Sequence, residues 1–577
     1  MTVSPECVLG NTLLSSFHAL IVGSGAGGAA AAHALTARGW NVLVLEAGNN
    51  YFPGLDQAGQ IPWPVYSNDE LKNRFRPAFW QDPFLEPRTF RQSEDEQARP
   101  RADVNLLPRM VGGGAVISTV SYPRFTEIDF RMKSALDAAG RDISGTSFAD
   151  WPLTYDELEP YYLEAEQLSG VAGADEGEDG SDPFASSRKG NLFPLPPQPE
   201  MYVGRVLANG ARKLGYHPFN YPSAINTRPR PDYEPDRPAA CVSCGYCSYS
   251  GCPRNAKGSP AVTTLRRALR TGRCQLRYIA HVKRVLVEGG HATGVEYFDP
   301  NGDLRTATAD RVILAASPIE TIRICFLSGG LGNATGHLGR HLMFHFQTTA
   351  AGFFRQRLHG ERGRSVTNGM SDFRGIKTRE EGGGLRDDAP LAGVIEFSTS
   401  SEPINSTVSS LQALPIARGY GLSLKDMLVE SPFQQHIAVM IMQGEDAPQY
   451  RNRVDLDPDV KDIFDLPVPR VTYTNHDFEK NASKHYKPLM LEVLGAAGAE
   501  FGLIEPFNPA NPPVSRHVLG GLRMGHDSST SVCDAYGKLH GFDNLYCVDG
   551  SVFVTGSGYN PTPTIIALAL RAAGAMT

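Results

Sequence analysis

The clearest pattern of apolar and polar positions lies near the start of the chain. Ala19–Val22 is a short continuous apolar run, and a second such run, Val42–Leu45, ends at the acidic residue Glu46. Between the two runs lie a glycine-rich turn and a segment of small residues that continues through Ala32. Short apolar runs of this kind are typical of buried strands, and small residues suit a helix that packs closely on them. The pattern predicts a strand, a glycine turn, a helix and a second strand.

The glycines of this turn indicate that the unit binds a dinucleotide. Gly23 allows a tight turn, Gly25 allows the backbone to approach a pyrophosphate, and Gly28 allows the helix to pack against the strand. The free N–H groups at the start of a helix attract phosphate oxygens. Glu46 is placed to accept hydrogen bonds from ribose hydroxyls, which argues against a ribose 2′-phosphate but does not separate NAD from FAD.

Later apolar runs complete the predicted fold. Arg311–Ala316 predicts another buried strand, and a helix with proline in its first turn begins after it. Residues 346–500 alternate strand-like runs with polar loops, most clearly at Ile437–Met442. The predicted fold class is α/β plus α+β, in which a Rossmann-like domain is interleaved with a substrate domain built on an antiparallel sheet.

Length, charge and cysteine content restrict the function further. A chain of 577 residues is too long for one core, and its net charge of −7 gives no reason to expect nucleic acid. No apolar run approaches the ~18–20 residues of a membrane helix, so we expect no direct membrane insertion. Residues 1–19 lack a basic region and a twin arginine, which predicts no export signal and a cytoplasmic location.

Three further segments carry candidate chemistry. Val111–Thr119 contains a second glycine turn, which a tight bend and a close approach to a cofactor explain equally well. His517–Gly525 reads H-x-x-G-G-x-R-M-G, and the chain ends with Val548-Asp549-Gly550-Ser551 followed by Asn560-Pro561.

Together with the first turn, these segments resemble the glucose–methanol–choline (GMC) family of flavin oxidoreductases. The resemblance covers the whole chain in scattered blocks, and it implies that the nucleotide is FAD. It also implies that the protein is an enzyme, an FAD-dependent alcohol or sugar oxidoreductase that acts on CH–OH groups. The resemblance further implies the residues that bind the cofactor, which are Gly23, Gly25, Gly28, Glu46, Gly113, Val282, Asp549 and Gly550.

The resemblance implies that His517 is the catalytic base and Asn560 its partner. A neutral histidine can remove the hydroxyl proton while hydride leaves carbon for flavin N5. Asn560 can hold the substrate oxygen without titrating. We interpret His341, His345, His526 and His540 as structural.

Two departures from the family pattern concern the flavin. Ser118 stands where the family usually has asparagine, which weakens the case for a direct flavin contact there. Members with a covalently attached flavin carry a histidine around this turn, and residues 100–120 contain none. We therefore expect non-covalent FAD.

We expect the FAD-binding domain to be discontinuous, formed by residues 1–48, 108–150, 241–345 and 515–577. Residues 49–107 are rich in proline, aromatic and charged residues and are predicted to form a lid or an oligomerisation excursion. Residues 151–240 and 346–514 are predicted to form the substrate-binding domain.

A cluster of cysteines, Cys241, Cys244, Cys247 and Cys252, looks like a segment of gluconate and fructose dehydrogenase large subunits and of glycoside 3-dehydrogenases and oxidases. Some of those relatives hold an iron–sulfur cluster here, and thiolates suit iron–sulfur or zinc chemistry. With no haem motif in the chain, we favour plain buried thiols, and thus no metal, over these four residues as cluster ligands.

The leading hypothesis is oxidation of a secondary alcohol of a sugar, glycoside or polyol to a ketone. Gln443 and Glu445 are the candidate substrate-binding residues, although a solvated acid at a strand end explains Glu445 equally well. One alternative is oxidation of an aromatic or aliphatic alcohol, for which aromatic side chains should line the pocket. Another is a non-oxidising flavoprotein, such as a lyase or an electron-transfer subunit. The electron acceptor stays open among oxygen, a quinone and a cytochrome.

Overall fold

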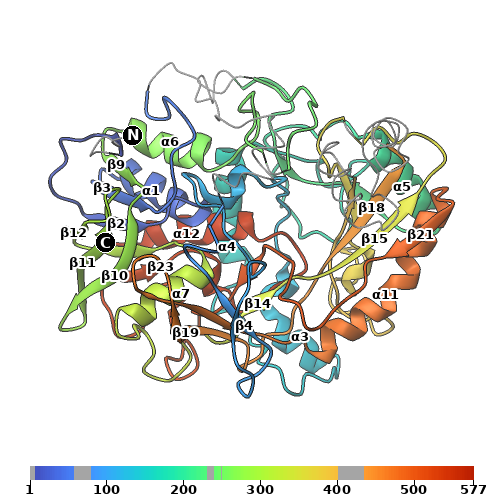
Figure 1. Cartoon of the computed structure of the whole chain (residues 1–577). Helices are drawn as coiled ribbons and strands as arrows, with labels where there is room; N and C mark the ends of the chain where they lie inside the picture. The colour runs from blue at the N-terminus through green and yellow to red at the C-terminus, as the bar shows by residue number, and fades with distance from the viewer. Residues whose placement is uncertain (1–6, 58–79, 231–238, 249, 361, 400–434) are drawn as a thin grey trace, which may run out of the picture.

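The computed structural model describes residues 7–57, 80–230, 239–248, 250–360, 362–399 and 435–577. Two large sheets organise the molecule, one at each side of the view in Figure 1. The sheet with the earliest strands lies near both labelled chain ends, and the sheet that contains β15, β18 and β21 lies at the opposite side.

The first sheet has six strands in the order β1-β9-β3-β2-β13-β23, and all neighbours are parallel except β1 and β9. Its strands are β1 (Val8–Gly10), β2 (Ala19–Val22), β3 (Val42–Glu46), β9 (Cys274–Tyr278), β13 (Val312–Leu314) and β23 (Leu545–Cys547). Strands β2, β3 and β13 are buried along their whole length, as parallel strands covered on both faces must be. Helices α1 (Ala26–Ala37) and α12 (Thr562–Ala575) pack on each other beside this sheet. The predicted strand–turn–helix–strand unit is confirmed.

The second sheet also has six strands, in the order β21-β15-β18-β17-β16-β7, and every neighbouring pair is antiparallel. Its strands are β7 (Pro218–Asn220), β15 (Phe346–Phe353), β16 (Asn368–Met370), β17 (Ile395–Ser398), β18 (Ile437–Gly444) and β21 (Phe501–Ile504). Apolar side chains on one face, including Met440 and Met442, pack in one cluster with helices α5 (Tyr202–Lys213) and α11 (Asp477–Ala496). The predicted antiparallel sheet within residues 346–500 is therefore confirmed.

The described residues also form four smaller sheets. They are β10 (His281–Glu288), β11 (His291–Phe298) and β12 (Leu304–Thr308); β19 (Arg453–Lys461), β20 (Pro467–Thr472), β4 (Thr89–Arg91) and β5 (Arg99–Pro100); β14 (Met343–Phe344) and β22 (Val518–Leu519); and β6 (Val171–Ala172) and β8 (Ser223–Ala224). The described part of the predicted excursion thus does not stand apart from the body. Its strand β4 pairs in parallel with β20.

The remaining helical segments are short, apart from α4. They are η1 (Gly113–Val116), η2 (Glu127–Arg131), α3 (Met132–Ala138), α4 (Tyr155–Ser169), η3 (Ala261–Leu265), α6 (Arg266–Arg270), α7 (Pro318–Leu327), η4 (Asp372–Arg374) and η5 (Gly550–Val552). Helix α4 belongs to the predicted substrate domain, yet it packs on α12 of the predicted FAD-binding domain. The domain boundaries stay a prediction.

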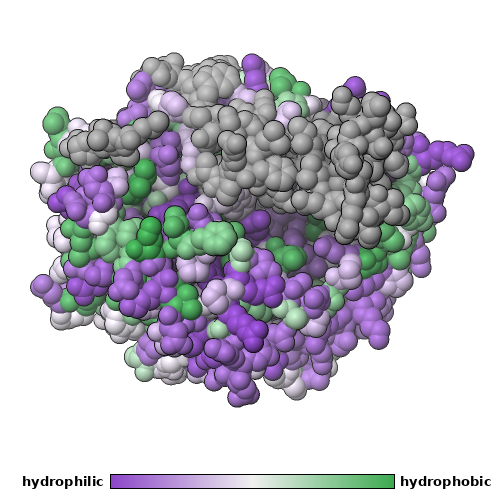
Figure 2. Space-filling model, in the orientation of Figure 1, coloured by the Kyte–Doolittle hydropathy of each residue, from purple (hydrophilic) through white to green (hydrophobic). Residues whose placement is uncertain are grey.

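Hydrophilic residues are prominent over the lower part of the face in Figure 2, which is hollowed near its centre. In the described part of the chain, we find no helix with the length and apolar character that crossing a membrane requires.

Candidate active site

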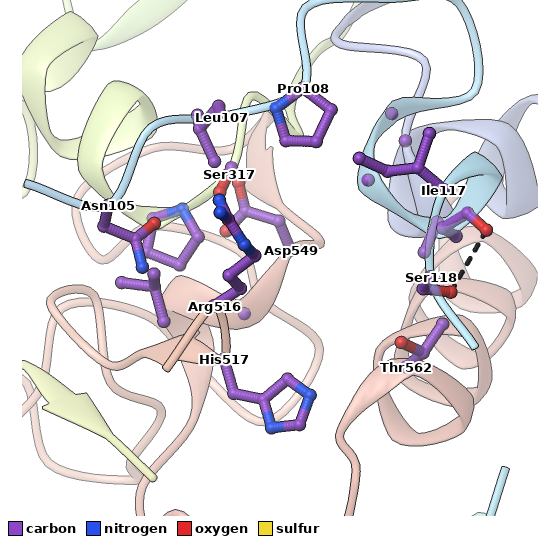
Figure 3. A pocket seen from close by; sticks show the side chains of 18 of the residues that line it. Asn105, Leu107, Pro108, Ile117, Ser118, Ser317, Arg516, His517, Asp549 and Thr562 are labelled. Atoms are coloured by element: carbon purple, nitrogen blue, oxygen red, sulfur yellow. Dashed lines mark hydrogen bonds between the residues drawn. The ribbon is translucent and has the colours of Figure 1, made fainter. Parts of the chain in front are cut away.

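A cavity of about 650 Å³ runs from the first glycine turn to the antiparallel sheet. Residues from both ends of the chain line it, together with residues from the segments between them. In Figure 3, the His517 ring projects into this space and faces the side that carries Ile117, Ser118 and Thr562. The cavity lies within the size range of ligand and cofactor sites.

The first glycine turn forms one end of the cavity. Gly23 has a φ of +99°, and a Cβ there would lie 2.4 Å from the Ala315 carbonyl oxygen. A Cβ on Gly28 would lie 2.0 Å from the Gly23 carbonyl oxygen, so this glycine serves the packing of α1 on the turn. A Cβ on Gly25 would meet nothing within 4 Å, and Gly25 borders the cavity. Only Gly25 therefore leaves space for a bound group.

Glu46 lies at the end of β3 beside this turn, lines the cavity and is held by three donors. Its Oε2 accepts hydrogen bonds from the backbone N–H and the hydroxyl of Ser24, at 2.9 and 2.6 Å, and its Oε1 accepts from Gly48 N–H at 2.8 Å. A carboxylate has about four acceptor positions, so one stays free for a ribose hydroxyl. Burial raises the pKa of Glu46. Ser24 was not predicted, although its place between two motif glycines was a usable signal.

The second glycine turn packs directly on the first. Gly113 has a φ of +61°, and a Cβ there would lie 2.9 Å from Gly25 Cα. The Gly112 N–H donates to the Ser24 hydroxyl at 3.0 Å, which joins the two turns. Ser118 lines the cavity, but its hydroxyl donates to the Ala115 carbonyl at 3.1 Å, drawn as a dashed line in Figure 3.

The other three predicted cofactor residues also line the cavity. Val282 is buried on β10, and Asp549 and Gly550 lie at the start of η5 after β23. The Asp549 carboxylate accepts hydrogen bonds from the hydroxyls of Thr321 and Ser551, both at 2.6 Å. Of the eight predicted cofactor-binding residues, the cavity brings together all but Gly28.

His517 lies directly before β22 and contacts a second histidine. Its Nδ1 is 2.8 Å from Nδ1 of His345, and the two rings meet at 87° with their centroids 4.8 Å apart. Burial, with His345 as the second cause, holds the pKa of His517 well below its ordinary value. The His517 ring is therefore neutral at pH 7.

Asn560 lines the same region and is oriented by two buried partners. Tyr221 donates its hydroxyl hydrogen to Asn560 Oδ1 at 2.7 Å, and Asn560 Nδ2 donates to Glu396 Oε1 at 3.0 Å. These bonds determine the orientation of the Asn560 amide group. They leave one Nδ2 hydrogen free to donate to a further acceptor.

A row of polar side chains on the antiparallel sheet faces the cavity. Gln443 on β18 donates to Glu396 Oε2 on β17 at 3.0 Å and accepts from Gln347 on β15 at 3.0 Å. Burial raises the pKa of Glu396. Neither Glu396 nor Gln347 was predicted. Glu396 follows Ile395 in an apolar strand, and the alternation of side chains along a strand was the signal that could have placed it on the opposite face.

The prediction that Glu445 binds substrate requires a correction, because Glu445 is not among the residues that line the cavity. It is buried, and its Oε1 accepts a hydrogen bond from Gly556 N–H at 2.9 Å while its Oε2 lies 3.8 Å from Arg374. Of the two candidate substrate residues, Gln443 is at the cavity and Glu445 supports the backbone behind it.

The four clustered cysteines lie apart from this cavity. They border a separate void of about 20 Å³, and all four are free thiols. Burial raises the pKa of Cys247 to about 12 and also raises that of Cys241. Within the described residues, no group of three or more His, Cys, Asp or Glu side chains is arranged to hold a metal ion.

Comparisons with known proteins identify a related enzyme family. The family described as GMC oxidoreductase matches residues 448–569, and an NAD(P)-binding Rossmann-like domain matches residues 21–55. Residues 448–569 therefore match a domain of the GMC oxidoreductases, and curated relatives of that family align over nearly the whole chain. The chain is accordingly an oxidoreductase enzyme, because the named GMC relatives are dehydrogenases and oxidases that act on alcohol groups.

Several relatives align over nearly the whole chain. A 2-methyl-1,2-propanediol dehydrogenase from Mycolicibacterium austroafricanum is 29% identical over 96% of this chain and 94% of its own. The gluconate 2-dehydrogenase flavoprotein of Pantoea cypripedii is 28% identical over 98% and 94%. A solved structure of pyridoxine 4-oxidase from Mesorbium loti superposes with a TM-score of 0.61 at 16% identity, covering 97% of this chain and 99% of that one, and supports the fold.

The match to the GMC oxidoreductase family implies FAD, and the residues present fit this cofactor. The N-terminus of α1 has no side-chain cap, so its first N–H groups are free for a phosphate, and Gly25, Ala26 and Gly27 there border the cavity. Glu46 and Val282 lie along the same cavity as this helix end, and His517 and Asn560 also line it.

Proposed function

We propose that this enzyme oxidises a secondary alcohol of a sugar, glycoside or polyol to a ketone. The observation that carries the proposal is the lining of the cavity near His517. Gln347, Glu396 and Gln443 supply amide and carboxylate groups there, and Ser398 lies on the same strand as Glu396. The described lining contains no Phe, Tyr or Trp side chain.

This lining favours a substrate with many hydroxyl groups. A hydroxyl-rich ligand loses its hydrogen bonds to water on binding and needs donors and acceptors in the site to replace them. An aromatic alcohol would instead gain from aromatic walls, which the described lining lacks. Gluconate and paromamine, named for two relatives, are polar and hydroxyl-rich in the same way.

We assign the base role to His517 and a substrate-orienting role to Asn560. FAD, when bound, supplies the hydride acceptor. His517 is neutral, because burial lowers its pKa, and a neutral imidazole nitrogen can take the proton of the substrate hydroxyl. Asn560 keeps one Nδ2 hydrogen that can donate to the substrate oxygen, while Tyr221 and Glu396 hold the amide in place.

We also propose that FAD is bound without a covalent link. His281 and His517 are the two histidines of the described lining, which contains no cysteine. His281 precedes Val282 at the nucleotide end, and His517 is needed as the base. Acid precipitation of the holoenzyme should release all flavin into the supernatant, and flavin that stays with the pellet would contradict the proposal.

The test of the substrate class is anaerobic bleaching of the flavin absorbance. The panel contains D-gluconate, D-fructose, methyl β-D-glucopyranoside, 2-methyl-1,2-propanediol and benzyl alcohol. We expect rapid bleaching by one or more of the three carbohydrate compounds and none by benzyl alcohol. Bleaching by benzyl alcohol alone would overturn the proposal. Carbon-13 NMR of the product distinguishes a ketone from an aldehyde or acid.

A further inference from the structure

The β14–β22 ladder brings two histidines into register. Its antiparallel pairs are Met343 with Leu519 and Phe344 with Val518. The next positions along this ladder are His345 and His517, and residues at facing positions of an antiparallel pair have Cβ atoms about 5 Å apart. The 2.8 Å contact between their Nδ1 atoms therefore follows from the backbone pairing.

The backbone on both sides of this pair is anchored by adjacent acids. The Phe344 N–H donates to Asp446 Oδ2 at 2.5 Å, which holds β14. The Gly556 N–H donates to Glu445 Oε1 at 2.9 Å, which holds the carbonyl-bearing loop behind His345. His345 is 2% exposed. The ring of His345 therefore has little freedom to turn.

The hydrogen bonds of His345 determine where each ring carries its proton. His345 Nε2 lies 3.1 Å from the Gly556 carbonyl oxygen, which can only accept, so Nε2 carries a hydrogen. Burial lowers the pKa of His345 to about 4, so the ring is neutral and its Nδ1 is an acceptor. The hydrogen between the two Nδ1 atoms must then belong to His517. Nε2 of His517 is left with a lone pair.

The charged groups around His345 do not change this assignment. Arg374 lowers the pKa of His345 and Asp129 raises it, and these two residues pair with each other at 2.5 Å. Glu445 Oε2 lies 3.8 Å from Arg374, and burial raises the pKa of Glu445 to about 8. Gln443 contributes a hydrogen bond that raises the pKa without cancelling the effect of burial.

We propose that His345 is a positioning residue that holds His517 in the tautomer whose Nε2 is unprotonated and available to the substrate. The proposal rests on the proposed function, in which His517 is the base. When the substrate O–H bond breaks and its proton forms a bond with Nε2, the Nδ1–H of His517 donates more strongly to His345. A neutral histidine thus does the work that a carboxylate does in many other enzyme sites.

The first test measures the tautomer directly and needs no substrate. Protein labelled with ¹⁵N in the histidine rings is studied by long-range ¹H–¹⁵N NMR, and H517Q identifies the His517 signals. We expect wild-type His517 to show a protonated Nδ1 and an unprotonated Nε2. H345L removes the acceptor and should give a mixture of tautomers. H345N places an amide oxygen where Nδ1 stood and should keep the wild-type form.

The second test measures flavin reduction by the panel compound that bleaches the wild-type enzyme fastest. We expect H345L to slow the limiting rate about tenfold or more and H345N to stay within about threefold of the wild type. H345D adds a charge beside His517 and should shift the acidic limb of the pH profile upward by about one unit. The control is H436N, because His436 also contacts a backbone carbonyl, that of Phe354, but does not line the cavity.

A protonated Nε2 in wild-type His517, or an unchanged tautomer in H345L, would overturn the role of His345. Full activity of H517Q would overturn the base assignment instead, and the NMR result would still decide the role of His345.

Discussion

At the scale of the residue, the site depends on which side chains are neutral at working pH. His517 is neutral because it is buried, and we expect H517Q to lower the rate of flavin reduction about 10²–10⁴-fold. FAD content should stay the same, because Gln is close in size to His. Stopped-flow reduction and the flavin-to-protein absorbance ratio check both points.

The control for this prediction is H526Q, since His526 is an exposed histidine of the same segment. It should reduce at the wild-type rate. An H517Q enzyme that keeps more than about a tenth of the wild-type rate would remove His517 from the base role.

Glu445 gives a pH-dependent prediction of stability. Burial raises its pKa to about 8, so the folded protein holds a proton that the unfolded chain loses above its ordinary pKa. This contribution is fully present below that ordinary value and is lost as the pH rises to about 8. E445Q keeps an acceptor oxygen for Gly556 and removes the titration. We expect the melting temperature of E445Q, relative to wild type, to rise from pH 5 to pH 8. The free energy of unfolding of E445Q should rise by up to about 4 kcal/mol relative to wild type over the same range.

Differential scanning fluorimetry across this pH range measures the effect. E505Q is the control, because Glu505 is exposed, and its melting temperature should follow the wild type at every pH. A constant offset between E445Q and wild type would show that Glu445 is ionised throughout.

At the scale of the element, alanine substitutions of Gly28 and Gly25 in the first turn should have different effects on stability and on FAD binding. A Cβ on Gly28 would lie 2.0 Å from backbone oxygen, so G28A must push α1 off the turn and should destabilise the FAD-free protein by about 1–3 kcal/mol. A Cβ on Gly25 meets nothing, so G25A should keep the FAD-free melting temperature and weaken FAD binding about tenfold.

Fluorescence titration of FAD-free protein with FAD, together with melting curves, separates the two effects. The control is G574A at the end of α12, where a Cβ also meets nothing and no cofactor lies. G25A that binds FAD as tightly as wild type would contradict the proposed pyrophosphate position.

The helices and strands also show which parts of the fold and the site could be predicted from the sequence. The unit from Ala19 to Glu46 was predictable because its strand, turn and helix signals are contiguous and its glycine positions follow from backbone geometry. The facing of His345 and His517 was not, since it depends on the register of two short strands far apart in the chain. Alternation along the strand could have placed Glu396 on the face opposite Ile395, but the sequence does not show that this face borders a cavity.

At the scale of the whole molecule, the cavity lies where the two large sheets and their connecting segments meet. The parallel sheet brings the glycine turn and Glu46, and the antiparallel sheet brings Gln347, Glu396 and Gln443. Residues 80–107, predicted as a lid or an oligomer contact, supply Gln81, Asn105 and neighbours to the wall. The choice between a lid and an oligomer contact, predicted for residues 49–107, stays open. Chain order therefore gives poor domain boundaries here, because each layer is completed by distant segments.

Substitution of Lys257 tests whether the second glycine turn and the cysteine segment support each other. Lys257 is buried, and its ammonium nitrogen lies 2.6–3.0 Å from the carbonyl oxygens of Val116 and Ser118 beside the cavity and of Cys247 and Ser250 in the cysteine segment. Its three hydrogens are shared among these four acceptors. K257M keeps the length of the side chain but leaves four acceptors without this donor. We expect a loss of about 3 kcal/mol or more in stability and weaker FAD binding, because the second glycine turn loses its support.

Hydrogen exchange locates the effect. In K257M, amides of residues 112–118 and of residues 247, 248 and 250–252 should lose protection together, whereas K484M, a change of an exposed lysine on α11, should alter neither. Loosening of the cysteine segment alone, with FAD affinity unchanged, would mean that the two segments are structurally independent. In that case the cavity wall would be stabilised by the two glycine turns and the Ser24 hydroxyl between them.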